Sequence, residues 1–206
     1  SVTLLLILGM IAAQAPSPKP KFDTAKYSTL QSVTKGTLDI KWKVIENGTK
    51  VMFYLKRTAP GWIGLGIGNG MVDSDWLFIR RGENNVPILK DCSFKDGTAN
   101  CQETEQAWTL ASEGSYTADA NSMEIEVVRS VKGSGNNMDK NLINGESQWT
   151  WALGSDDLAT DDRPTNGHPP GANNRGNFKI WMAVMSGSIL KTGFAVALLG
   201  FLALMM

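Results

Sequence analysis

A single histidine, His168, limits the chemistry available to this chain of 206 residues. It lies in the run from Thr165 to Gly171, which is rich in turn-forming residues. Sites built from several imidazoles are therefore excluded, including multi-histidine zinc centres and the copper centre of a monooxygenase. A Ser-His-Asp hydrolase would need His168 as its base, yet the sequence contains no Gly-x-Ser-x-Gly nucleophile elbow.

The partner that best suits this histidine is Met71, at the end of the glycine-rich stretch that begins at Gly61. A methionine usually fills the core, but Met71 stands between Gly70 and an acidic turn, which is a poor place for a core side chain. A thioether paired with an imidazole forms an axial ligand set for haem iron. Met71 and His168 are therefore the candidate iron ligands. With both axial positions filled, the iron would transfer electrons rather than turn over a substrate.

The stretch before Met71 has a second unusual property, a glycine at every second position. Because side chains alternate along a strand, the apolar residues between the glycines, Ile63 to Ile67, should face the core. The opposite face, formed by Gly64, Gly66 and Gly68, is then bare backbone that permits a flat group to approach closely. It would equally suit packing against another backbone or a neighbouring aromatic ring.

The middle of the chain predicts short antiparallel strands. Apolar and polar residues alternate along 38–45, and the pair Asn47-Gly48 marks a hairpin turn before a strand at 51–55. No long stretch has helical periodicity, so the sequence predicts an all-β fold, an antiparallel immunoglobulin-like β-sandwich. Further strands are expected at 62–67, 76–80, 87–90, 107–111, 123–128, 148–152 and 178–184, with long loops at 133–146 and 156–176.

The order of these motifs resembles that of DOMON domains, the sandwich domains of dopamine β-monooxygenase relatives and of the cytochrome portion of cellobiose dehydrogenase. The resemblance rests on the run from Trp62 to Asp75, on the strand 149–154 (Trp-Thr-Trp-Ala-Leu-Gly), and on His168 followed by Arg175-Gly176. In haem-binding members a methionine after the glycine-rich strand and a histidine in the late loop ligate b-type haem. The resemblance implies these roles for Met71 and His168, and it implies that the glycine face lies along the macrocycle.

The resemblance further implies an extracellular protein that carries haem b and passes single electrons between a separate redox partner and small redox molecules. The alternative within the same family is a module without haem, either carbohydrate-binding or structural. Exposed tryptophans would stack on glycans, although Trp149 with Trp151, and Trp76 with Phe78, suit a core. Aspartates at 156, 157, 161 and 162 offer calcium ligands, but their spacing matches no calcium loop and favours a solvated acidic segment.

Both ends of the chain are apolar. We expect residues 1–15 to be a secretory signal peptide that lacks its N-terminal part, followed by a linker at 16–24. The domain then occupies residues 25–185. Residues 186–206 fit a GPI-attachment signal, with Ser186 as the attachment site and an uncharged tail at 193–206 that is short for a membrane span. A tail anchor is the alternative.

The two cysteines, Cys92 and Cys101, are expected to form a disulfide, because an even pair in an exported chain is most simply a bonded one. Asn47 begins the one glycosylation sequon, Asn-Gly-Thr, and its place at a hairpin tip should expose it. Twenty basic and twenty acidic residues give a formal net charge of zero, which argues against nucleic acid as a partner. A lipid anchor would supply the membrane contact.

Overall fold

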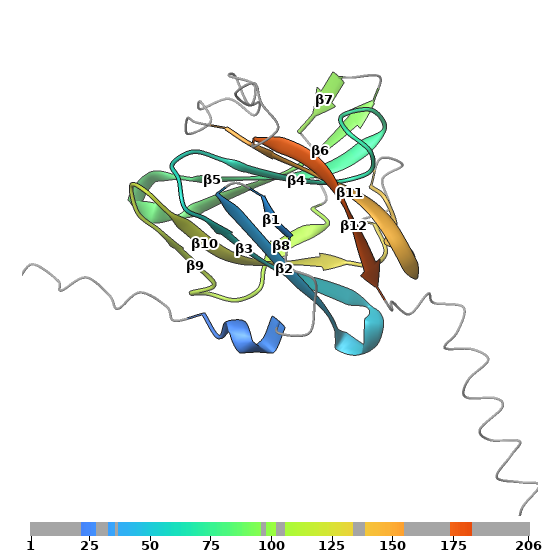
Figure 1. Ribbon diagram of the computed structural model, residues 1–206, viewed down its shortest axis with the longest axis horizontal. Coiled ribbons are helices and arrows are strands. Elements are labelled where there is room, and N and C mark those ends of the chain that lie inside the picture. The colour runs from blue at the N-terminus through green and yellow to red at the C-terminus, as the bar shows by residue number, and fades with distance from the viewer. Residues whose placement is uncertain are drawn as a thin grey trace, which may run out of the picture.

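The computed structural model describes residues 22–27, 33–35, 37–95, 98–101, 106–133, 139–154 and 174–182. Over these residues the chain forms two antiparallel sheets packed face to face, with three short 3-10 helices and no α-helix (Figure 1). The predicted all-β antiparallel sandwich is therefore confirmed. The expected signal peptide, His168 and Ser186 lie outside the described residues.

Sheet A contains β1, β2, β3, β10 and β8 in that order, with β9 also paired to β10. Its centre is the β2–β3 hairpin, where Trp42 lies opposite Phe53 and alternate side chains face the second sheet. The strands are β1 Val33–Lys35, β2 Leu38–Ile45, β3 Lys50–Arg57, β8 Trp108–Leu110, β9 Tyr116–Ala118 and β10 Met123–Ser130.

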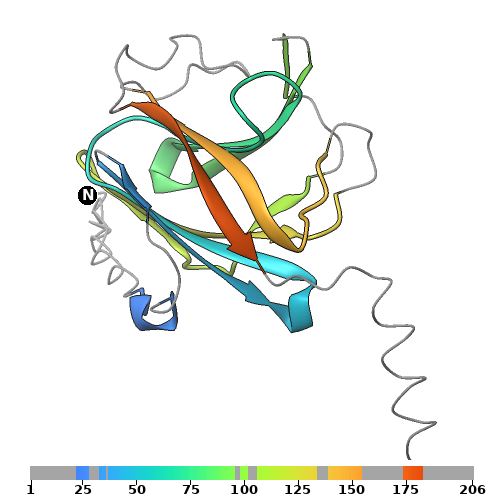
Figure 2. The same cartoon turned by 45° about the vertical axis from the view of Figure 1, so that its right-hand side comes forward.

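Sheet B contains β12, β11, β4, β5, β6 and β7 in that order. The chain enters this sheet after β3 and enters it again after β10, so β4 and β11 lie side by side although they are far apart in sequence (Figure 2). The strands are β4 Ile63–Ile67, β5 Ser74–Arg81, β6 Pro87–Lys95, β7 Thr98–Asn100, β11 Gly145–Leu153 and β12 Arg175–Met182.

The main apolar core lies between the two sheets. Ile63, Leu65 and Ile67 of β4 belong to it, as the alternation predicted. Aromatic rings fill its centre: the rings of Phe53 and Trp149 are 5.0 Å apart, centroid to centroid, and join the sheets. Each large ring removes much apolar area from water on burial, which is the main favourable term in folding.

One buried ion pair also joins the sheets. Arg129 of β10 donates from Nη2 to Oδ2 of Asp75 on β5 at 2.5 Å, and the two side chains are 0% and 1% exposed. The same carboxylate oxygen accepts the backbone N–H of Lys140 at 2.9 Å, and Arg129 donates to the Lys140 carbonyl. The guanidinium carbon lies 5.6 Å from the centroid of the Trp108 ring. A charge at this depth is tolerated only because it is paired and hydrogen-bonded.

A short helix, η1 (Thr24–Tyr27), covers the outer face of sheet A (Figure 2). Tyr27 is 1% exposed and donates its hydroxyl to Oε1 of Glu126 on β10 at 2.9 Å. Lys26 pairs with the same carboxylate at 2.7 Å. Burial, helped by the hydrogen bond and charge of Glu126, raises the pKa of the Tyr27 phenol, so it remains a protonated donor.

The predicted hairpin turn after residue 45 is present, and a short 3-10 helix forms it. The helix η2 (Glu46–Gly48) closes the β2–β3 hairpin, and Asn47 at its tip is exposed with a positive φ of 53°, so the predicted exposure of the sequon is confirmed. A similar helix, η3 (Glu83–Asn85), joins β5 to β6. The strands β1, β7 and β9 were not predicted; each has three residues, too few for a periodic signal.

Replacing Arg129 with Met should lower the free energy of unfolding by about 3–5 kcal/mol, because the Asp75 carboxylate would be left buried without its cation. Urea unfolding followed by tryptophan fluorescence measures this. The matched control is Lys179→Met, which removes an ion pair with Glu146 whose side chains are 62% and 57% exposed. That control should change stability by no more than about 0.5 kcal/mol. Equal, small losses in both variants would contradict the role of Arg129.

Candidate functional site

Met71 lies in the turn between β4 and β5, and the residue is 43% exposed. The turn needs left-handed backbone at Gly68 and Gly70, with φ values of 131° and 96°. A Cβ on Gly70 would meet no atom within 4 Å, so backbone conformation, not space, calls for glycine there. The thioether is therefore presented at the surface and is not core filler. Its neighbour Val72 is 61% exposed and extends this small apolar patch.

The turn that carries Met71 is fixed at both ends. On one side β4 pairs with β11, and the N–H of Gly68 donates to the carbonyl of Gln148 at 2.9 Å. On the other side the buried Asp75 begins the β5 ladder. The backbone that carries the exposed thioether is therefore held at both ends of the turn.

A contact across the sheet connects this turn to the late part of the chain. Asn177 near the start of β12 donates from Nδ2 to Oδ1 of Asn69 at 2.7 Å. Residues 155–173, which include His168, stand in the sequence between β11 and β12. The strand that follows these residues is therefore tied to the turn that holds Met71. The position of His168 itself lies outside the described residues, and the Met71–His168 pair stays a prediction.

The glycine face of β4 is the outer face of sheet B, and aromatic side chains of the same sheet cover it. A Cβ on Gly66 would lie 2.7 Å from Cδ2 of Trp76 and 2.8 Å from Cγ2 of Thr150. A Cβ on Gly64 would lie 3.1 Å from both Trp76 and Phe78. The flat group along these glycines is thus an indole of this chain, which is the aromatic packing that the sequence left open.

These rings belong to a second apolar cluster, separate from the core between the sheets. The rings of Trp76 and Phe78 are stacked, with 9° between their planes and 5.6 Å between their centroids. The predicted disulfide is confirmed within this cluster, where Cys92 of β6 is bonded to Cys101. The members of the cluster are Trp62, Trp76, Phe78, Cys92, Phe94, Cys101 and Ala152.

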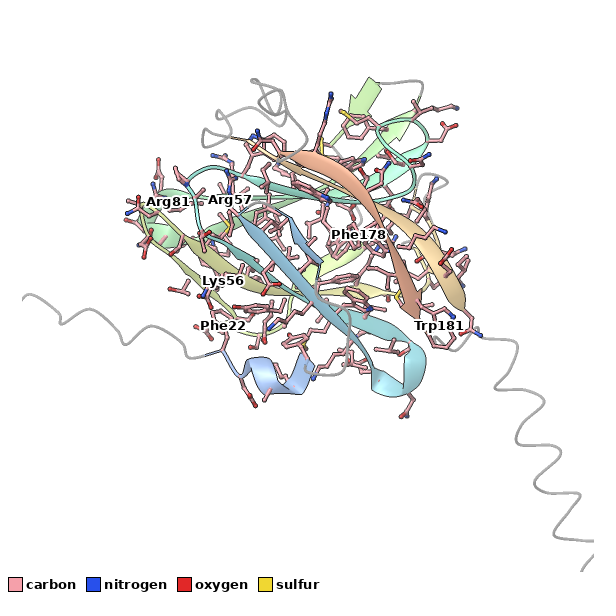
Figure 3. The ribbon with its side chains drawn as sticks, in the orientation of Figure 1. Phe22, Lys56, Arg57, Arg81, Phe178 and Trp181 are labelled. Atoms are coloured by element: carbon pink, nitrogen blue, oxygen red, sulfur yellow. A yellow bond between two sulfur atoms is a disulfide. The ribbon has the colours of Figure 1, made fainter. Side chains whose placement is uncertain are left out.

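Six of the seven tryptophans are at most 3% exposed and cannot stack on a ligand in this conformation. The exception is Trp181 on the edge strand β12, which is 63% exposed. Figure 3 shows it at the end of β12, away from Phe178, which belongs to the core. Trp149 and Trp151 lie in the core as expected, whereas Trp76 and Phe78 lie in the outer cluster.

The sequence reasoning missed the polar groups inside the sandwich. Asp75 follows Met71 in an acidic stretch of the sequence, but it is the second residue of β5 and points into the core. Its signal was its spacing, since it shares the alternation of Leu77 and Ile79 and so must share their face. Arg129, at the end of the predicted strand 123–128, follows the same rule with Ile125 and Val127.

Comparison with known proteins gives a family and a fold. The family model of the DOMON domain matches residues 34–154. The cytochrome b domain of pyranose dehydrogenase from Coprinopsis cinerea is similar in structure, with a TM-score of 0.54 at 12% identity, covering 73% of this chain and 80% of that one. The cytochrome domain of Myriococcum thermophilum cellobiose dehydrogenase gives 0.55 at 14%, covering 78% and 86%. No curated protein sequence is significantly similar.

No helix among the described residues is long and apolar enough to cross a bilayer.

Replacing Gly66 with Ala should cost about 1–3 kcal/mol of stability, because the new methyl group would overlap the Trp76 indole and the Thr150 methyl. A double-mutant cycle with Trp76→Leu tests the contact directly by chemical unfolding. If the indole lies along Gly66, the Gly66→Ala change should cost less in the Trp76→Leu background than in the parent. Additive losses would contradict the packing described for this face.

Proposed function

This chain belongs to the DOMON domain family, and we propose that it binds b-type haem and transfers single electrons. The observation that carries the proposal is the exposed thioether of Met71 on a turn anchored at both ends. Two of the solved structures that are similar in fold, the cytochrome domains described above, support the same function at the level of the fold.

The donor set suits haem iron. Met71 offers a soft, neutral sulfur ligand, and His168, as the one imidazole in the chain, is the remaining nitrogen ligand. Bound haem supplies a one-electron iron couple, and methionine ligation favours its reduced form. The chain would contribute the two ligands and the anchored turn, whose fixed backbone lowers the entropy lost when the thioether binds.

Gly64 and Gly66 could contact haem only if the side chain that now covers them moved away. Gly64 and Gly66 were expected to contact the macrocycle, but Trp76 lies along both in the structure. A haem held by Met71 would touch these two glycines only in exchange for the Trp76 ring. Gly68 lies next to the Met71 turn and faces Ser74, with a Cβ position 3.2 Å from the Ser74 Cβ.

We place the domain outside the cell, where its redox partner would be a separate molecule. The Cys92–Cys101 disulfide supports this, because structural disulfides persist in oxidising compartments. The exposed sequon at Asn47 fits the same setting. Attachment of a lipid anchor at Ser186 remains a prediction.

Purified full chain incubated with haemin should develop the sharp Soret and visible bands of six-coordinate, low-spin iron. Replacing Met71 with Leu should remove the methionine ligand and convert the spectrum, and His168→Ala should do the same. The matched control is Met52→Leu, a half-buried methionine on β3, which should leave the spectrum unchanged. If the Met71 and His168 variants both retain the parent spectrum, the ligand assignment is wrong.

The alternative, a carbohydrate-binding module, now depends on Trp181, because the other indoles are buried. Under that alternative the purified chain would stay colourless with haemin, and glycans would change its tryptophan fluorescence saturably. Replacing Trp181 with Ala should then abolish the change, since a sugar needs an exposed aromatic ring on which to stack. We expect no such saturable change, and observing one without any Soret band would favour the sugar-binding function over haem.

A further inference from the structure

A second group of possible ligands lies inside the sandwich, apart from the surface turn of Met71. Asp75 of β5, Asp91 of β6 and Asp139, in the segment before β11, each direct a carboxylate oxygen to one place. These oxygen atoms all lie within 4.8 Å of one another. Asp75 and Asp91 are 1% and 0% exposed, so this is a buried group and not a solvated acidic surface.

The strand register explains why two of these carboxylates meet. Asp75 lies directly opposite Ser93 in the β5–β6 ladder, and Asp91 precedes Ser93 by two residues. Side chains two residues apart share a face, so all three project from the inner face of sheet B. Directly opposite residues have Cβ atoms about 5 Å apart. The ladder therefore places the Ser93 hydroxyl beside both carboxylates.

Two buried oxygen atoms here lack a partner. The Ser93 hydroxyl is on a residue 2% exposed and makes no hydrogen bond. Oδ1 of Asp75 also makes none, although Oδ2 of the same carboxylate accepts from Arg129 and from the N–H of Lys140. Leaving a buried acceptor or hydroxyl unsatisfied is costly, and native structures rarely do so without an ion or a water.

Electrostatics points the same way. Burial disfavours a negative charge on Asp75, and the nearby Asp139 carboxylate repels that charge, while Arg129 attracts it. One guanidinium can compensate one carboxylate, and Asp75 already engages it. A small divalent cation would be attracted by three neighbouring carboxylates and would use the two oxygen atoms that lack a partner, Asp75 Oδ1 and the Ser93 hydroxyl.

We propose that Asp75, Asp91 and Asp139 bind a calcium ion between the sheets, with the Ser93 hydroxyl as a neutral oxygen ligand. Calcium accepts six to eight oxygens in flexible geometry at 2.3–2.6 Å, so two of its ligands stand at most about 5.2 Å apart. The 4.8 Å spread of the carboxylate oxygens fits that limit. Magnesium, with bonds near 2.1 Å and strict octahedral geometry, is less well suited.

The proposed ion would act on the fold and, through it, on the Met71 turn. It would bind β5 to β6 and to the segment at Asp139, next to the Arg129 contact that reaches sheet A. Asp75 follows Met71 by four residues, so fixing its carboxylate fixes the end of the turn that holds the thioether. This inference does not depend on haem, since its ligands lie inside the sandwich.

The test uses the full chain without haem, stripped with a chelator and then titrated with calcium chloride by isothermal titration calorimetry and thermal unfolding. We expect one calcium per chain and a rise in Tm of about 5–10 °C at a calcium concentration one hundred times Kd. Magnesium chloride at the same concentration should give a smaller rise. A stripped protein that neither binds calcium nor changes its Tm would overturn the proposal.

Two variants identify the site. Asp91→Asn keeps the shape of the side chain and an oxygen to accept from the N–H of Ala107, which Asp91 Oδ2 does at 2.7 Å. In chelator it should unfold at the same temperature as the parent or a higher one, because a buried charge is gone. In calcium it should unfold at a lower temperature than the parent, because the ion no longer binds. A purely structural Asp91 would not give this reversal.

If the Asp91→Asn variant does not fold, Ser93→Ala tests whether calcium binds at this site. Removing a buried hydroxyl without a partner should leave the chelated protein at least as stable, while calcium affinity falls several-fold. The control is Asp39→Asn on the outer face of sheet A, which should keep the full calcium-induced shift. A shift that survives both Asp91→Asn and Ser93→Ala would place calcium elsewhere and reject the site.

Discussion

The contact between Asp75 and Arg129 determines how the two sheets sit on each other. A sandwich core of apolar side chains is tolerant of small shifts, because dispersion and burial have little directionality. A guanidinium that must reach one carboxylate and the Lys140 carbonyl is directional, and at 0–1% exposure no water can replace either partner. Whether the pair adds net stability over an apolar replacement is a separate matter. Removing only one partner of the pair destabilises the fold, because the other charge is then left buried without compensation.

The outer face of sheet B shows how a second constraint operates. Gly64 and Gly66 leave space that large rings of the neighbouring strand fill. The Trp76 ring is held there by a hydrogen bond from its Nε1 to the Ser74 hydroxyl at 2.7 Å. The disulfide closes the same cluster from the β6 side. The sheet is therefore packed on both faces near the Met71 turn, although only one face belongs to the main core. Buried packing on two sides makes β4 a rigid support for the turn that follows it.

The sequence predicted the parts of the molecule whose patterns are local. Alternation located β2, β3, β4, β5 and β10, and the exported character of the chain predicted the Cys92–Cys101 bond; both are confirmed. Alternation also placed Ile63, Leu65 and Ile67 in the core. What lies on the other side of the glycines could not be predicted, because it depends on which strand becomes the neighbour of β4. The same reason hid the inward carboxylates: Asp75 and Asp91 become neighbours only when β5 and β6 pair in the observed register.

The described part of the fold separates two kinds of ligand chemistry on one strand connection. Within five residues the chain passes from the exposed sulfur of Met71 to the buried oxygens of Asp75. A thioether is a soft donor that suits haem iron, whereas carboxylates and a hydroxyl are hard donors that suit calcium. Each site would therefore reject the metal of the other by donor type alone. The two groups are also separated in space, because the Met71 turn faces solvent while the carboxylates lie between the two sheets. The backbone around the Met71 ligand would thus be held rigid by the buried Asp75 carboxylate at the other end of the β4–β5 connection.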